Sequence, residues 1–182
     1  ALAPVCKRTT GGDVERLREV YRTRDPQAPV MMSFLDNADL GERFRHQKTP
    51  QDQVTLGLTL LLTLSGIPCI LYGTEQDLSG VVNAAGNPAP VPYEGVREAL
   101  WGKPDAFSED GATFKTIAEL SKIRSAESAL CSGAQYFRPV SAGGSEGFGL
   151  PLGVGGVVAF SRILAGREVV VVANTEIGRA HV

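Results

Sequence analysis

Two short apolar runs, with a longer one between them, dominate the hydrophobic pattern in the first half of the chain. The runs at Val30–Leu35 and Cys69–Tyr72 have the length of strands and lack the alternation of a half-exposed strand, so we expect neighbours on both of their faces. Between them, Pro50–Leu64 has the length of a helix, with the Thr49 hydroxyl as its predicted N-cap and Gly66 beyond its end. This order predicts a βαβ unit with a parallel strand pair.

The second half of the chain predicts one more helix and then only strands. Apolar residues recur at helical spacing in 114–124. From about residue 125, strand-like segments at 135–140, 156–162 and 168–174 are separated by glycine-rich turns, and Ala165–Gly166 fits a hairpin turn between the last two. The pattern therefore favours an α/β region followed by an all-β region.

Two other stretches bear on the fold class. Asp13–Tyr21 has apolar residues at helical spacing and predicts an amphipathic helix ahead of the first strand. Val54–Tyr72 carries no charge over nineteen residues, a length that would suit a membrane span. Gly66 and Pro68 interrupt this stretch, so we interpret it as a buried helix and strand and expect no membrane partner.

Composition and charge narrow the classes of function. The 182 residues carry 18 lysines and arginines against 20 aspartates and glutamates, so the chain lacks the positive charge of a nucleic-acid binder. A neutral ligand such as a sugar is compatible with this balance. The three cysteines, Cys6, Cys69 and Cys131, lack the spacing of a metal site, and we expect neither a disulfide nor a zinc site.

Polar motifs follow both predicted strands, and together they resemble one enzyme family. Phe34–Asp39, Phe-Leu-Asp-Asn-Ala-Asp, resembles the Phe-x-x-Asn-His-Asp motif that ends the seventh barrel strand in the alpha-amylase family, glycoside hydrolase family thirteen. Gly66–Glu75, Gly-Ile-Pro-Cys-Ile-Leu-Tyr-Gly-Thr-Glu, resembles that family's Gly-Ile-Pro-x-x-Tyr-Tyr-Gly-x-Glu at the eighth strand. Either motif alone is weak, but both in order, joined by one capped helix, are specific.

The resemblance implies an α/β fold, in which the last strands and helices of a (β/α)8 TIM barrel precede a truncated all-β domain. We expect residues 1–125 to form the C-terminal part of the alpha-amylase-like barrel and residues 126–176 to begin a C-terminal β-sandwich domain. Residues 177–182 resemble a translated DNA-sequencing adapter and are left out of the fold. The alternative, a complete small domain, would need its own cover for both faces of a two-strand sheet.

The resemblance also implies a site at the carboxyl ends of the strands. Retaining glycosidases use two carboxyl groups about 5 Å apart, one as nucleophile and one as acid/base. The alpha-amylase family adds an aspartate after the seventh strand that orients the sugar, and Asp39 matches it as a catalytic residue. Asn37, Arg43 and Glu75 are predicted to bind the substrate, an alpha-glucoside or oligosaccharide, with no metal and no other cofactor. The alternative for Asp39 is a solvated carboxylate or helix cap.

Two departures from the family pattern limit what this chain can do. The family's nucleophile and acid/base lie on earlier barrel strands that this chain does not match, so we expect the 182 residues to be inactive alone. Ala38 stands where the motif has a histidine that donates a hydrogen bond to the sugar. His46, on the same loop, either supplies that donor or is an ordinary loop residue.

We therefore predict a fragment of a retaining alpha-glucoside hydrolase or transglycosylase. The alternative is a non-catalytic alpha-amylase-like protein that serves in binding or assembly.

Overall fold

The computed structural model describes residues 19, 21, 30–40, 42–46, 48–80, 96–141, 147–149 and 156–175. Its elements follow in this order: β1 (Met32–Phe34), α3 (Gln51–Thr63), β2 (Ile67–Cys69), the 3-10 helix η1 (Thr74–Gln76), α4 (Ala112–Ala126), α5 (Ser128–Ser132), β3 (Ala134–Phe137), β4 (Val140–Ser141), β5 (Phe148–Gly149), β6 (Val157–Leu164) and β7 (Arg167–Asn174). Most of the predicted helix at 13–21 and the whole tail at 177–182 lie outside the described residues.

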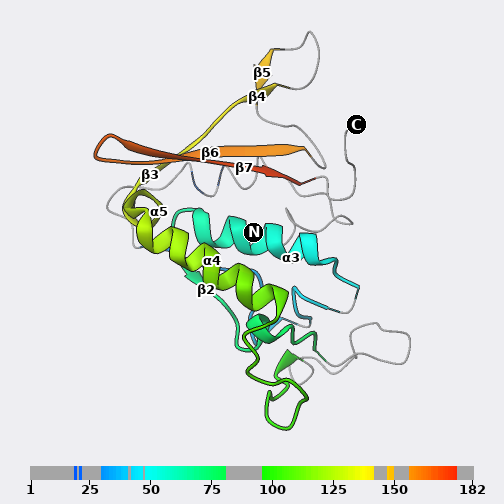
Figure 1. Ribbon diagram of the computed structural model, residues 1–182. Coiled ribbons are helices and arrows are strands. Elements are labelled where there is room, and N and C mark those ends of the chain that lie inside the picture. The colour runs from blue at the N-terminus through cyan, green and yellow to red at the C-terminus, as the bar shows by residue number, and fades with distance from the viewer. Residues whose placement is uncertain are drawn as a thin grey trace.

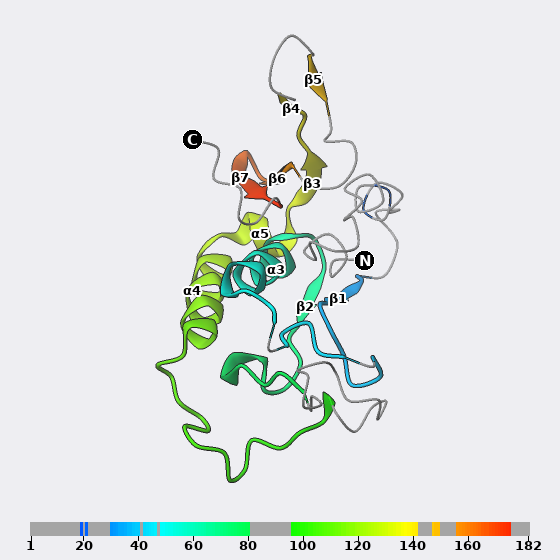
Figure 2. The ribbon, with the colours of Figure 1, turned by 90° about the vertical axis from the view of Figure 1, so that its right-hand side faces the viewer.

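Figures 1 and 2 show how these elements are arranged around α3, with β1 and β2 on one side, α4 alongside and the β6–β7 hairpin on a further side. Within the described parts of the chain, no helix combines the length and the apolar character needed to cross a membrane.

β1 and β2 form the predicted parallel pair, with Met32 opposite Ile67. β2 begins two residues before the predicted strand at Cys69–Tyr72, and that prediction of the strand's position was wrong. The reason is Gly66, which has a φ of 124° and turns the chain so that the Ile67 N–H donates to the Met31 carbonyl at 2.9 Å. The parallel ladder therefore starts as soon as the turn ends.

α3 is the predicted central helix, but its first turn is arranged differently from the prediction. The helix spans Gln51–Thr63 and Pro50 takes the N-cap position, without a capping hydrogen bond from a side chain. The Thr49 hydroxyl instead donates to the Phe44 carbonyl at 3.2 Å and accepts from the His46 N–H at 3.1 Å. Thr49 thus closes the preceding loop rather than capping the helix.

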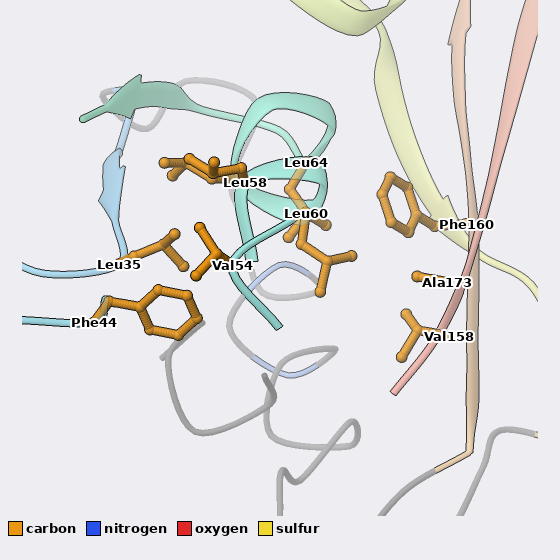
Figure 3. Packing of buried hydrophobic residues seen from close by; sticks show 10 residues of the cluster. Leu35, Phe44, Val54, Leu58, Leu60, Leu64, Val158, Phe160 and Ala173 are labelled. Atoms are coloured by element: carbon orange, nitrogen blue, oxygen red, sulfur yellow. The ribbon is translucent and has the colours of Figure 1, made fainter. Parts of the chain in front are cut away.

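The hydrophobic core extends across both sides of α3, because this helix is apolar around most of its circumference. The buried residues of this core are Leu35, Phe44, Val54, Leu58, Leu60, Leu61, Leu64, Val158, Phe160 and Ala173. Figure 3 shows Val54 on the side of the helix that faces Leu35 and Phe44, and Leu60 on the side that faces Phe160 of the hairpin. One core therefore joins the segment that follows β1, the helix and the β-sheet.

The apolar runs predicted neighbours on both faces of the β1–β2 pair. The structure instead leaves large apolar side chains of both strands exposed. Met32 is 62% exposed, Ile67 is 52% exposed and Phe34 is 39% exposed. A pair of strands with one helix against it buries only one of its faces. Apolar surface of this kind favours association with other chains or segments.

The all-β region contains the three predicted strands as an antiparallel sheet in the order β3–β6–β7. β6 and β7 are joined by Ala165 and Gly166, whose φ values are 48° and 81°. Two consecutive positive φ angles are the signature of the type I′ turn, whose twist matches that of the strands it joins. The predicted hairpin at this position is confirmed.

Two arginines bind the carboxyl end of α3 to the rest of the protein. Arg162 of β6 is only 1% exposed and donates from Nη1 to the Thr63 carbonyl at 2.8 Å. Arg124 of α4 donates from Nη1 to the Leu62 carbonyl at 2.7 Å. Cationic donors satisfy carbonyl groups that have no partner inside the helix and complement its dipole. The end of α3 is thus fixed by elements on two sides.

Candidate functional site

The turn that follows β1 presents an exposed carboxylate. The Asn37 side-chain oxygen accepts hydrogen bonds from the Asp39 and Leu40 N–H groups, each at 3.0 Å, as in an Asx turn. This arrangement fixes the backbone from the inner side of the turn. The Asp39 side chain points outward and is 80% exposed.

A buried ion pair lies next to this turn. Asp36 is 5% exposed and Arg43 is 2% exposed. The Asp36 Oδ2 atom lies 3.4 Å from the Arg43 Nε atom and also accepts the Phe44 N–H at 2.8 Å. A buried charge is costly unless an opposite charge lies beside it, and these two charges lie together. Asp36 therefore closes the loop between β1 and α3 from within.

The Arg43 guanidinium also connects three separate segments. It donates to the Tyr72 carbonyl at 3.0 Å, to the Thr74 hydroxyl at 3.0 Å and to the Val96 carbonyl at 3.3 Å. The loop after β1, the loop after β2 and the backbone at Val96 are thus held together. Arg43 was predicted to bind substrate, but its buried side chain presents no donor at the surface.

The chain after β2 turns sharply into η1. Gly73, with a φ of 83°, precedes this short helix, which contains the half-buried Glu75. Asp77, directly after η1, accepts a hydrogen bond of 2.5 Å from the Thr113 hydroxyl and lies 3.3 Å from the Arg45 Nε atom. These contacts fix η1 against the start of α4 and against the loop before α3.

Arg97 reaches the exposed side of the Asp39 turn from a distant part of the sequence. Its Nη2 atom lies 3.2 Å from Asp39 Oδ1, and its Nε atom donates to the Ala38 carbonyl at 3.3 Å. The Arg97 side chain is 55% exposed. A guanidinium and a carboxylate thus stand together at the surface beside the end of β1.

The four residues predicted for the site are distributed over this arrangement in different ways. Asn37 and Asp39 share one turn, whereas Arg43 is buried and Glu75 lies in η1, after the neighbouring strand. Among the described residues, no hydrogen bond or ion pair joins Glu75 to the Asp39 turn. Sequence reasoning missed Arg97, which is 58 residues from Asp39 and carries no motif signal.

The chemistry open to these groups is that of one carboxylate beside a cation. Within the described ranges, no group of three or more His, Cys, Asp or Glu side chains is placed to hold a metal ion. A single exposed carboxylate can accept hydrogen bonds from hydroxyl groups and stabilise a developing positive charge, but two carboxyl groups are needed for retaining hydrolysis. Fold and site together define an α/β protein with a polar site at the carboxyl ends of parallel strands.

The sequence is similar to those of known alpha-amylases and cyclomaltodextrin glucanotransferases. The chain is 32% identical over 117 residues to Alpha-amylase 1 of Lipomyces kononenkoae, a match that covers 63% of this chain and 17% of the relative. It is 30% identical over 112 residues to a cyclomaltodextrin glucanotransferase of Bacillus licheniformis, covering 62% of this chain and 14% of that protein. The chain thus spans less than one fifth of the length of these relatives. No family model matches it.

The fold is also similar to solved structures of proteins with these names. A cyclomaltodextrin glucanotransferase with a three-domain ABC distribution matches 95% of this chain and 31% of its own length, with a TM-score of 0.67 and 25% identity. An alpha-amylase from Anoxybacillus matches 96% of this chain and 33% of its own, with a TM-score of 0.64 and 19% identity. The resemblance to the alpha-amylase family that the two motifs carry is confirmed.

Proposed function

We propose that these 182 residues are part of a longer enzyme that acts on alpha-glucosides as a hydrolase or transglycosylase. The observation that carries this proposal is Asp39, an exposed carboxylate on a hydrogen-bonded turn at the carboxyl end of a parallel strand. The substrate class follows from the names of the relatives, which are alpha-amylases and cyclomaltodextrin glucanotransferases. We call a protein of the relatives' length that contains this chain the longer enzyme.

In this proposal, residues 1–125 supply the last strands and helices of a (β/α)8 barrel and residues 126–176 begin the C-terminal β-domain. Residues 177–182 do not contribute to either. The hydrophobic core supports a fixed arrangement of the two parts, because α3 packs against Leu35, directly after β1, on one side and against the β6–β7 hairpin on the other.

Each candidate residue then has a role that fits its position. The nucleophile and the acid/base come from parts of the longer enzyme that these residues do not provide, and Asp39 stabilises the distorted, positively charged sugar between them. Asn37 shapes the turn and lies beside the sugar, and Glu75 contacts the substrate from η1. Arg43 supports the site from within, since its guanidinium is buried.

A second candidate function is favoured by one residue. Ala38 occupies the position of the motif histidine, and loss of a substrate-binding donor fits a relative that has given up catalysis for binding or assembly. Activity of the longer enzyme decides between the two: turnover of an alpha-glucan that depends on Asp39 supports the enzyme, and binding without turnover supports the alternative.

The 182 residues alone are expected to show no glycosidase activity, because one carboxylate cannot supply both nucleophile and acid/base. They are also expected to associate as their concentration rises, through the exposed apolar side chains of β1 and β2. Release of nitrophenol from a nitrophenyl alpha-glucoside and size-exclusion chromatography over a concentration series measure the two properties. Turnover by this chain above that of its own Asp39→Asn variant would contradict the proposal.

Ala38→His in the longer enzyme is expected to raise kcat/KM for an alpha-glucoside by roughly tenfold. A hydrogen bond is worth about 0.5–1.5 kcal/mol, and about 1.4 kcal/mol corresponds to a factor of ten in rate. Steady-state kinetics of the two proteins provide the measurement.

His46 is the control for this prediction, because it is the other source of an imidazole near the turn. Its Nδ1 atom accepts the Lys48 N–H at 3.2 Å, which ties the ring to its own loop. We therefore expect His46→Ala to leave kcat/KM unchanged. Loss of activity in His46→Ala, together with no gain in Ala38→His, would instead show that His46 supplies the donor.

A further inference from the structure

We infer that Arg97 is a positioning residue for Asp39, which sets the orientation of this carboxylate without itself needing to touch the reacting sugar. The inference rests on the proposed function of Asp39 as a catalytic residue. It adds to that function a second residue, from a segment that carries neither family motif.

Arg97 holds the turn at two points. One planar guanidinium donates to Asp39 Oδ1 and to the Ala38 carbonyl, at 3.2 and 3.3 Å. Two acceptors on adjacent residues restrict both the backbone of the turn and the side-chain torsions of Asp39, because the donors of an arginine are fixed relative to one another. A lysine at position 97 would lack this fixed geometry.

The backbone that carries Arg97 is itself anchored. Val96 is 3% exposed, and its carbonyl accepts a hydrogen bond of 3.3 Å from the buried Arg43. The same Arg43 pairs with Asp36 beside the Asp39 turn. The buried Arg43 side chain therefore contacts both the backbone next to Arg97 and the residue next to the turn. These contacts hold Arg97 and the turn at a fixed distance from each other.

Asn37 and Arg97 hold different groups of Asp39. Asn37 accepts the Asp39 N–H at 3.0 Å, and Arg97 donates to the Asp39 carboxylate at 3.2 Å. Asp39 is 80% exposed and packing does little to hold it, so these hydrogen bonds define its position.

Loss of Arg97 should affect the rate far more than the stability. Exposed ion pairs contribute little to the stability of the fold, because water and salt screen the two charges. A misplacement of about 1 Å at a catalytic group, in contrast, can lower a rate by about a hundredfold. A fall in kcat without a fall in the unfolding temperature is therefore the expected signature of a positioning residue.

The first test is Arg97→Gln in the longer enzyme, with Arg138→Gln as the matched control. Arg138 is also half-exposed and also bridges two acceptors, Ser161 and Glu168, but it lies directly after β3. We expect kcat to fall by tenfold or more in Arg97→Gln, with KM within about threefold, and neither parameter to change in the control. An unchanged kcat, or a rise confined to KM, would overturn the inference.

The second test repeats Arg97→Gln in an Asp39→Ala background, where the carboxylate is absent. A residue that acts through Asp39 loses its effect there, so kcat should change by less than about twofold. If the full loss persists, Arg97 acts on the substrate directly and the inference is overturned. If Asp39→Ala alone has no effect, the proposed function of Asp39 fails first, and the inference falls with it.

Discussion

Replacement of Asp39 by asparagine in the longer enzyme is expected to lower kcat and kcat/KM together by about a thousandfold or more, a factor that corresponds to about 4 kcal/mol. Asparagine keeps the size of the side chain and its capacity to accept a hydrogen bond, but it removes the negative charge. A charge aimed at the positive sugar of the transition state stabilises that state more than the bound substrate, so kcat carries the loss.

Steady-state kinetics on an alpha-glucan measure this effect, and Asp110→Asn serves as the control. Asp110 is another exposed aspartate, 96% exposed and 3.6 Å from the Lys115 ammonium, but it lies in the segment before α4 and belongs to neither motif. Its replacement should leave both parameters unchanged. An Asp39→Asn enzyme that keeps its activity within about threefold of the parent, well under 1.4 kcal/mol, would eliminate the assignment.

Phe160→Ala is expected to cost about 3–5 kcal/mol of the free energy of unfolding. The Phe160 ring is fully buried and lies 6.0 Å from the Phe137 ring, centroid to centroid. It packs against the side of α3 that carries Leu60, so its loss leaves a cavity at the joint between helix and sheet. Urea titrations of the longer enzyme with and without the substitution, followed by circular dichroism, give the change.

Tyr136→Ala is the matched control for this cavity. Tyr136 lies on the neighbouring strand, opposite Ser161, and is 51% exposed. Removal of a half-exposed ring creates no cavity, and we expect a cost of about 1 kcal/mol or less. Equal losses in the two variants would mean that the sheet does not share the core of α3.

The sequence predicts which helices and strands form better than it predicts the residues at which they begin and end. α3 and the β6–β7 hairpin follow from long apolar patterns and from turn residues with one preferred geometry. The start of β2 does not follow, because Cys69–Tyr72 is more apolar than Ile67–Cys69. Pairing is decided instead by the positive φ of Gly66 and a hydrogen bond to Met31, which is a tertiary contact.

At the candidate site, Asp39 and Asn37 belong to one motif and lie together on one turn, as their spacing in the sequence suggests. The burial of Arg43 is not predictable in the same way, because charged residues on loops usually face water. Its position depends on acceptors from three segments, the Tyr72 and Val96 carbonyls and the Thr74 hydroxyl, that only the fold brings together. Arg97 escapes sequence analysis for the same reason.

The position of α3 between the parallel pair and the β-sheet affects how proteins of this kind can be recombined. An exchange of the β-region between relatives, made at residue 125, would separate Leu60 from the hairpin side chains that cover it. The incoming β-region would have to match the shape of that helix surface and supply an arginine where Arg162 meets the Thr63 carbonyl. A chimaera that folds would therefore need to take α3 and the β-sheet from the same parent protein.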